Sequence, residues 1–91
     1  MIYIYLRQTV EDYARWKEGF DNHIVARRAG GATDEAYVMR NVDNPNDITV
    51  VLGWCDLEKA RAFSQSVSLQ AALQKAGVTD PPEVRFLEAT G

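Results

Sequence analysis

The chain has 91 residues, of which 46% are hydrophobic and 25% are charged, and its net charge is −3. These values are typical of a globular protein, and the length predicts a single domain over residues 1–91. The acidic balance argues against a nucleic-acid partner, because such partners favour a basic face. The single cysteine, Cys55, excludes an intrachain disulfide and a cysteine-based metal site.

The N-terminal residues 1–7 are apolar but short and alternating. They lack the basic start and the long apolar run of a signal peptide. No stretch of the sequence approaches the length of a membrane span. Together with the unpaired cysteine, these features predict a cytoplasmic protein without a membrane partner.

Residues 2–8 alternate in the manner of a β-strand, and both of their faces are largely apolar or aromatic. Such a strand is expected in the centre of a sheet that is covered on both sides. Thr9 and Asp12 form a T-x-x-D pattern, which predicts a capping box. We therefore expect a helix over residues 10–28, ended by the glycines at 30 and 31.

The rest of the chain predicts a hairpin, a second helix and a final strand. Residues 48–54 are again apolar on both faces, so the third strand is also expected to be central. Asp56 is a suitable N-cap for the second helix, which serines interrupt near residues 64–68 and Gly77 ends. The predicted ranges are strand 35–42, turn 43–47, strand 48–54, a helix after Asp56, and strand 83–88.

This order of elements, β-α-β-β-α-β, predicts an α+β ferredoxin-like sandwich with an antiparallel four-stranded sheet. Right-handed crossovers place the first and third strands in the centre and both helices on one face. The alternation then leaves Tyr3, Tyr5, Val51 and Leu87 on the uncovered face. An uncovered apolar face usually marks an interface, so we expect a homodimer paired through the open face of the sheet.

His23 is the only histidine and thus the candidate acid–base residue near neutral pH. It falls on one side of the first helix together with Tyr13, Trp16, Phe20 and Arg27. If Arg27 approaches the imidazole, it disfavours the protonated form. The alternative is a partly buried histidine that packs and makes one hydrogen bond. For Arg27 and its neighbour Arg28, the simplest interpretation is a solvated helix end.

Tyr13, Trp16, Phe20 and Trp54 are the candidate lining of an apolar ligand pocket. Such aromatic residues more often form the core or an interface, and that alternative stays open. Arg7 and Arg40 lie on predicted strands, where an arginine is either an ion-pair partner or an anchor for an acidic ligand. Ion pairing is the simpler expectation for both.

The sequence predicts neither a metal site nor a bound cofactor. One histidine and no cysteine cluster leave only carboxylates, and the acidic turn at 43–47 is too short for a calcium loop and contains Pro45. The glycines at 30 and 31 follow a helix instead of a strand, so they do not form a phosphate-binding loop.

Two segments resemble a known superfamily. The pattern V-x-D-Y-x-x-W-x-x-x-F-D-x-H spans residues 10–23, and D-L-E-K-A-R-A-F spans 56–63, followed by S-x-x-L at 66–69 and A-G-V at 76–78. Together they resemble small proteins of the dimeric α/β-barrel superfamily. Relatives there include the antibiotic-biosynthesis-type monooxygenases and certain polyketide cyclases. The resemblance covers nearly the whole chain and implies the ferredoxin-like fold and its homodimer.

For function, the resemblance implies a protein that binds or converts a small aromatic or polyketide-like compound without a metal, as a cofactor-free monooxygenase or a cyclase. It also implies that Tyr13, Trp16, Phe20 and His23 lie near the pocket. The alternative is a non-catalytic module, either a ligand sensor or a dimeric interaction domain. RNA binding through Tyr3 and Tyr5 is disfavoured, because the third strand lacks the basic-glycine-aromatic signature.

Overall fold

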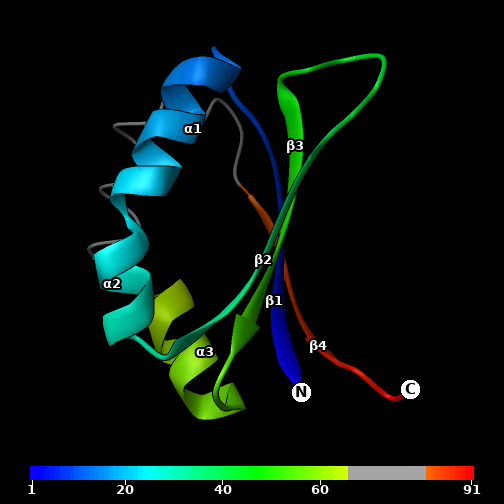
Figure 1. Cartoon of the computed structure of the whole chain (residues 1–91). Coiled ribbons are helices and arrows are strands. Elements are labelled where there is room, and N and C mark those ends of the chain that lie inside the picture. Colours follow the sequence, from blue (N-terminus) through cyan, green and yellow to red (C-terminus); the bar gives the residue numbers. More distant parts are fainter. Residues whose placement is uncertain (66–81) are drawn as a thin grey trace.

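The computed structural model describes residues 1–65 and 82–91 (Figure 1). Four strands form one antiparallel sheet in the order β2-β3-β1-β4, and the helices lie on one side of it. This confirms the ferredoxin-like fold, with the first and third strands in the centre. The elements are β1 (Ile2–Thr9), α1 (Tyr13–Asn22), α2 (Ile24–Ala29), β2 (Ala32–Arg40), β3 (Asp47–Trp54), α3 (Leu57–Ser64) and β4 (Glu83–Glu88).

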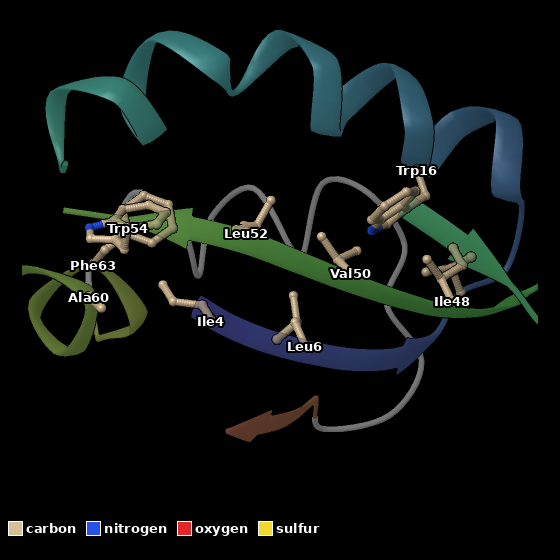
Figure 2. Close-up of a cluster of buried hydrophobic side chains, with 10 residues drawn as sticks. Ile4, Leu6, Trp16, Ile48, Val50, Leu52, Trp54, Ala60 and Phe63 are labelled. Carbon is tan, nitrogen blue, oxygen red and sulfur yellow. The ribbon is translucent and has the colours of Figure 1, made fainter. Parts of the chain in front are cut away.

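The core lies between the sheet and the helices, and the two central strands supply most of it (Figure 2). Ile4 pairs with Leu52 and Leu6 with Val50 across the β1–β3 ladder, so their side chains share one face. That face carries buried apolar residues at alternate positions, as strand geometry requires. Its buried hydrophobic members from the two strands are Ile4, Leu6, Ile48, Val50, Leu52 and Trp54.

The opposite face of the sheet has no helix over it in the described part of the chain (Figure 1). Tyr3 pairs with Leu87 and Tyr5 with Val51, which confirms the predicted register of all four residues. Strand β2 extends this surface because Tyr37 pairs with Val51 and Met39 lies two residues further on. We call this surface the open face; its apolar and aromatic members are Tyr3, Tyr5, Tyr37, Met39, Val51 and Leu87.

The predicted capping box is wrong, because the strand before the helix runs further than the pattern indicated. Thr9 is the last residue of β1 and pairs with Asp47. Asp12 is the N-cap instead, and its carboxylate accepts a hydrogen bond of 2.9 Å from the backbone N–H of Ala14. Helix α1 therefore begins at Tyr13 rather than at Val10.

The predicted single helix over 10–28 is also divided in two at His23, whose backbone leaves the helical region with φ −87° and ψ 4°. The Phe20 carbonyl just before the break accepts hydrogen bonds from the His23 N–H, at 3.2 Å, and from the Arg27 guanidinium. A side chain that bonds to a main-chain carbonyl competes with the regular helical ladder, which is a recognised cause of a kink.

Strand β2 begins at Ala32, three residues before the predicted start, and ends at Arg40. Gly31 adopts φ 114°, which lets the chain leave α2 and pair at once with the end of β3. The register between β2 and β3 then shifts between Ala32 and Ala36. The resulting irregular stretch faces α2, and contacts between α2 and β2 place it beside the site described below.

The predicted turn at 43–47 is confirmed up to Asn46, because Asp47 is already the first residue of β3, and this turn is hydrogen-bonded to the start of α1. The amide of Asn46 accepts a hydrogen bond from the Tyr13 N–H at 3.2 Å and donates one to the Glu11 carbonyl at 3.3 Å. The Asn46 carbonyl also accepts from the Val10 N–H at 2.9 Å. We call these three hydrogen bonds of Asn46 the Asn46 clasp; they join segments that lie 33 residues apart.

Helix α3 begins as predicted, with the Asp56 carboxylate accepting a hydrogen bond of 2.8 Å from the Lys59 N–H. Strand β4 has the predicted bounds. The predicted continuation of the second helix, its end at Gly77 and most of the serine interruption lie outside the described residues. Among the described residues, no helix is long and apolar enough to cross a membrane.

Candidate functional site

Three of the predicted pocket residues lie together along α1. The rings of Tyr13 and Trp16 are 6.0 Å apart, and those of Trp16 and Phe20 are stacked at 5.1 Å. We call these three residues the aromatic row. Trp16 is 2% exposed, whereas Tyr13 and Phe20 are only partly buried. The row therefore has a buried centre and two ends that reach toward the surface.

Trp54 does not join the aromatic row. Figure 2 shows it at the opposite end of the core from Trp16, where its ring lies 4.6 Å from that of Phe63. Its indole N–H donates a hydrogen bond of 2.9 Å to the Gly30 carbonyl, which fastens the end of α2 to β3. With 1% of its surface exposed, Trp54 serves the core in this structure.

His23 occupies the junction of α1 and α2, on the same side of the sheet as the core. Its ring is half-buried and lies 5.8 Å from the ring of Phe63. Burial of the imidazole lowers the pKa of His23 below its ordinary value, and the nearby Arg27 guanidinium lowers this pKa further. The predicted effect of Arg27 is thus confirmed. At neutral pH the imidazole is neutral and able to accept a proton.

Arg27 is not part of a solvated helix end, which corrects the interpretation from sequence. It is 7% exposed, while Arg28 remains exposed with an ion pair to Asp34 at 3.8 Å. The Arg27 guanidinium lies 3.9 Å from the ring centroid of Phe20 and donates a hydrogen bond to the Phe20 carbonyl. Burial lowers the pKa of Arg27, yet a guanidinium stays protonated at neutral pH.

A small pocket opens between α2 and the irregular part of β2. Its cavity volume is about 50 Å³. Typical ligand pockets hold roughly 300–1,000 Å³, so this one accommodates a small group and not a whole aromatic compound. We call it the Arg27 pocket; it is lined by Ile24, Arg27, Arg28, Ala32, Thr33, Asp34, Glu35, Ala36 and Leu52.

Gln8 is a second polar residue buried inside the apolar layer, and it was not among the site residues predicted from the sequence. It is 3% exposed, and among the described residues neither its amide nitrogen nor its amide oxygen has a hydrogen-bond partner. It pairs with Ile48 on the helix-facing side of β1. A buried polar group without a partner costs free energy of folding, so its presence calls for a physical explanation.

The strand arginines behave differently from one another. Arg7 forms the expected ion pair, with its guanidinium 2.8 Å from the Asp47 carboxylate. Arg40 instead lies over the Tyr13 ring, 4.3 Å from its centroid.

On the open face, the Tyr3 hydroxyl donates a hydrogen bond of 2.7 Å to Glu35, and this bond raises the pKa of the Tyr3 phenol.

The described residues contain no group of three or more histidine, cysteine, aspartate or glutamate side chains that could hold a metal ion. The candidate chemistry of the described site therefore consists of a neutral imidazole, an aromatic row, a buried guanidinium and an unpaired amide. These groups can bind an aromatic compound, accept a proton and orient polar substituents.

Comparison with protein-family models gives no match, and no curated protein matches the sequence. Solved structures do match over nearly the whole chain. A protein of Bordetella bronchiseptica assigned as an antibiotic biosynthesis monooxygenase is 20% identical, with 98% of this chain and 96% of that chain covered and a TM-score of 0.79. SnoaB of Streptomyces nogalater, a cofactor-independent oxygenase, is 17% identical, with 99% and 93% covered and a TM-score of 0.79.

A further structure, from Nitrosomonas europaea, is likewise assigned as an antibiotic biosynthesis monooxygenase. It is 14% identical, with 98% of each chain covered and a TM-score of 0.72. Identities this low establish the fold and leave the activity to be argued from the site. The chain thus shares its fold with proteins assigned as antibiotic biosynthesis monooxygenases, which is the fold that its sequence motifs predicted.

Proposed function

We propose that this protein converts a small aromatic or polyketide-like compound without a metal or an organic cofactor, as an oxygenase or a cyclase. The observation that carries the proposal is the similarity of fold to SnoaB, a cofactor-independent oxygenase, over 99% of this chain. The partly buried rings at the two ends of the aromatic row, Tyr13 and Phe20, supply apolar surface against which a flat substrate can pack. Without a cofactor, the substrate itself must supply the electrons that reduce oxygen.

In this proposal His23 is the general base. Its lowered pKa keeps the imidazole neutral at pH 7, and the neutral form accepts a proton from the substrate. Its place at the junction of α1 and α2 is one residue beyond the helix that carries the aromatic row. Substrate packed against the exposed end of that row, at Phe20, would lie within a turn of helix of the imidazole.

The activity is tested by oxygen uptake and product analysis with a panel of aromatic polyketide-like compounds, in buffer that contains a metal chelator. We expect turnover by the purified protein and a loss of about 10²–10⁴-fold in kcat for His23→Ala, which is the usual contribution of a general base. Asn22→Ala, an exposed neighbour, is the matched control and should keep the wild-type rate. Full activity of His23→Ala would remove His23 from the mechanism.

We further propose that two copies pair through the open face. The apolar and aromatic side chains of that face have no cover within the described chain, and Tyr37 and Met39 are 53% and 49% exposed. At 91 residues a single copy buries a modest fraction of its surface, so pairing adds a useful amount of apolar contact. Face-to-face contact of two identical sheets also satisfies two-fold symmetry.

Light scattering after size exclusion tests the pairing at micromolar concentration, and we expect the mass of two chains. Met39→Glu places a charge in the open face and should shift the protein toward a monomer. Val42→Glu is the control, because Val42 is 98% exposed and lies beyond the end of β2. A monomeric wild-type protein, or equal dimerisation of both variants, would contradict the proposal.

One observation favours a non-catalytic alternative, in which the protein senses a ligand or acts as a dimeric interaction module. Two of the four predicted pocket residues, Trp16 and Trp54, are 2% and 1% exposed and belong to the core. Calorimetric titration of the same compounds separates the two functions. Binding without turnover for every compound would support the sensor, and turnover would exclude it.

A further inference from the structure

The buried Arg27 guanidinium forms fewer hydrogen bonds with its described surroundings than it has N–H groups to donate. The side chain is 7% exposed, and its described contacts are the ring and the carbonyl of Phe20. A guanidinium carries several N–H donors, and only one hydrogen bond is formed by this group within the described structure. Most of its capacity to donate is therefore unused although the group is largely removed from water.

No carboxylate of the described residues forms an ion pair with Arg27. The acid that most favours its charge is Asp21, but both oxygens of that carboxylate bind the Lys17 ammonium, at 2.7 and 2.9 Å. Burying a charge without an opposite charge is unfavourable, and stacking on an aromatic ring offsets only part of the cost. An anion beside Arg27 would supply the missing charge.

The Arg27 pocket has the size and lining for such an anion. Its volume of about 50 Å³ exceeds that of a single water site and is far below that of a pocket for a large compound. Ile24, Ala36 and Leu52 contribute apolar walls. This combination of one buried cation and a short apolar wall suits a carboxylate attached to a small hydrocarbon group.

The two acidic residues of the lining do not oppose an anion inside the pocket. The Asp34 side chain is 98% exposed and is paired with Arg28 at the surface. The Glu35 carboxylate accepts a hydrogen bond from the Tyr3 hydroxyl, and Tyr3 lies on the open face, on the other side of the sheet. Both carboxylates are thus directed away from the buried guanidinium.

We propose that the Arg27 pocket binds the carboxylate of a small organic acid, with the Arg27 guanidinium as its partner. This site lies between α2 and β2 and does not depend on the oxygenase or cyclase activity proposed above. Arg28 and Asp34 form its surface rim. The ligand is singly charged, because a single buried guanidinium offsets one negative charge.

Propionate is a suitable probe, and propionamide is its neutral counterpart of the same shape. In a nitrogen–proton correlation spectrum at constant ionic strength, propionate should shift the Arg27 side-chain Nε–Hε signal in a saturable way. Propionamide should bind at least about tenfold more weakly, because it lacks the charge that a charge-assisted hydrogen bond needs. No substrate turnover is needed for this measurement, so its outcome is independent of the proposed activity.

Variants at position 27 test whether the Arg27 guanidinium is the group that binds propionate. Arg27→Met keeps the aliphatic stem without the charge and should weaken propionate binding about tenfold or more, and Arg27→Lys should retain part of it. Arg85→Gln is the matched control and should bind within about twofold of wild type, because Arg85 is exposed on β4 and does not line the pocket. Circular dichroism establishes that each variant is folded.

The proposal is overturned if propionate leaves the Arg27 Nε–Hε signal unchanged, or if propionamide binds as tightly as propionate. Equal binding by wild type and Arg27→Met would also overturn it. Should Arg27→Met not fold, the wild-type spectrum and the Arg27→Lys variant still decide between these outcomes.

Discussion

Replacing Gln8 by methionine should stabilise the protein, although it removes a hydrogen-bonding group. Gln8 is 3% exposed, and both its amide atoms lack a hydrogen-bond partner within residues 1–65 and 82–91. An amide buried without a partner costs about 1–3 kcal/mol in proteins. Methionine has nearly the same length and shape, carries no group that needs a hydrogen bond, and adapts to irregular cores.

We expect a gain at the lower end of that range, because the amide also makes packing contacts that methionine reproduces imperfectly. A gain of about 1 kcal/mol raises the Tm of a domain of this size by roughly 4–8 °C. Urea denaturation should show a higher midpoint with an unchanged slope, which identifies a true change in stability. Gln65→Met is the surface control and should change stability by less than about 0.5 kcal/mol.

A destabilised Gln8→Met variant would refute this reasoning, because it would mean that the amide has a partner in solution. A second readout gives the result functional meaning. If Gln8→Met is more stable but binds the aromatic compounds of the activity assay more weakly, then the unpaired amide is retained for ligand binding at the expense of stability.

Three further predictions concern other parts of the molecule. Because the folded state lowers the pKa of His23, the unfolded chain takes up a proton first as the pH falls, so stability should decline as the pH falls through the ordinary histidine pKa of about 6.5. In His23→Asn, the urea midpoint should depend less on pH than in wild type. A pH dependence equal to that of wild type would contradict the assignment of this effect to His23. Gly31→Ala should cost about 2 kcal/mol of unfolding free energy, since φ is 114° and a Cβ would lie 2.7 Å from the Cys55 Sγ. Gly91→Ala, with open space around it, should change nothing in the same denaturation experiment. Asn46→Ala should lower the Tm, because two hydrogen bonds to the start of α1 are lost at about 1 kcal/mol each, whereas a Tm equal to wild type would show that the clasp is not needed.

The fold was predictable because its main signal is local and periodic. Residues 2–8 and 48–54 are apolar on both faces, and this is the property of strands that occupy the centre of a sheet. The registers of Tyr3 with Leu87 and of Tyr5 with Val51 follow from the same alternation. The bounds of β4 were also readable, because two prolines precede it.

The break at His23 was not readable, since the apolar spacing continues through it without interruption. It coincides with a contact between the Arg27 side chain and the Phe20 carbonyl, which spacing alone does not reveal. The start of α1 was misjudged for a related reason. Pairing with Asp47 extends β1 to Thr9, so a tertiary contact outweighs the local capping pattern.

The site was less predictable than the fold, because the same aromatic residue types can either pack in the core or bind a ligand. Trp16 and Trp54 could not be separated by sequence, yet they lie at opposite ends of the core (Figure 2). Gln8 and Arg27 did carry a signal that could have been used. Each is a polar residue at a position whose periodic neighbours are apolar, which is the pattern expected where function overrides packing.

The Asn46 clasp has a consequence for how the molecule opens. Because the Tyr13 amide is held by a side chain from the β2–β3 turn, its protection against hydrogen exchange depends on a segment 33 residues away. The first turn of α1 and the tip of the hairpin should therefore open together as one cooperative unit. Motion at that tip would then change the position of the helix that carries the aromatic row.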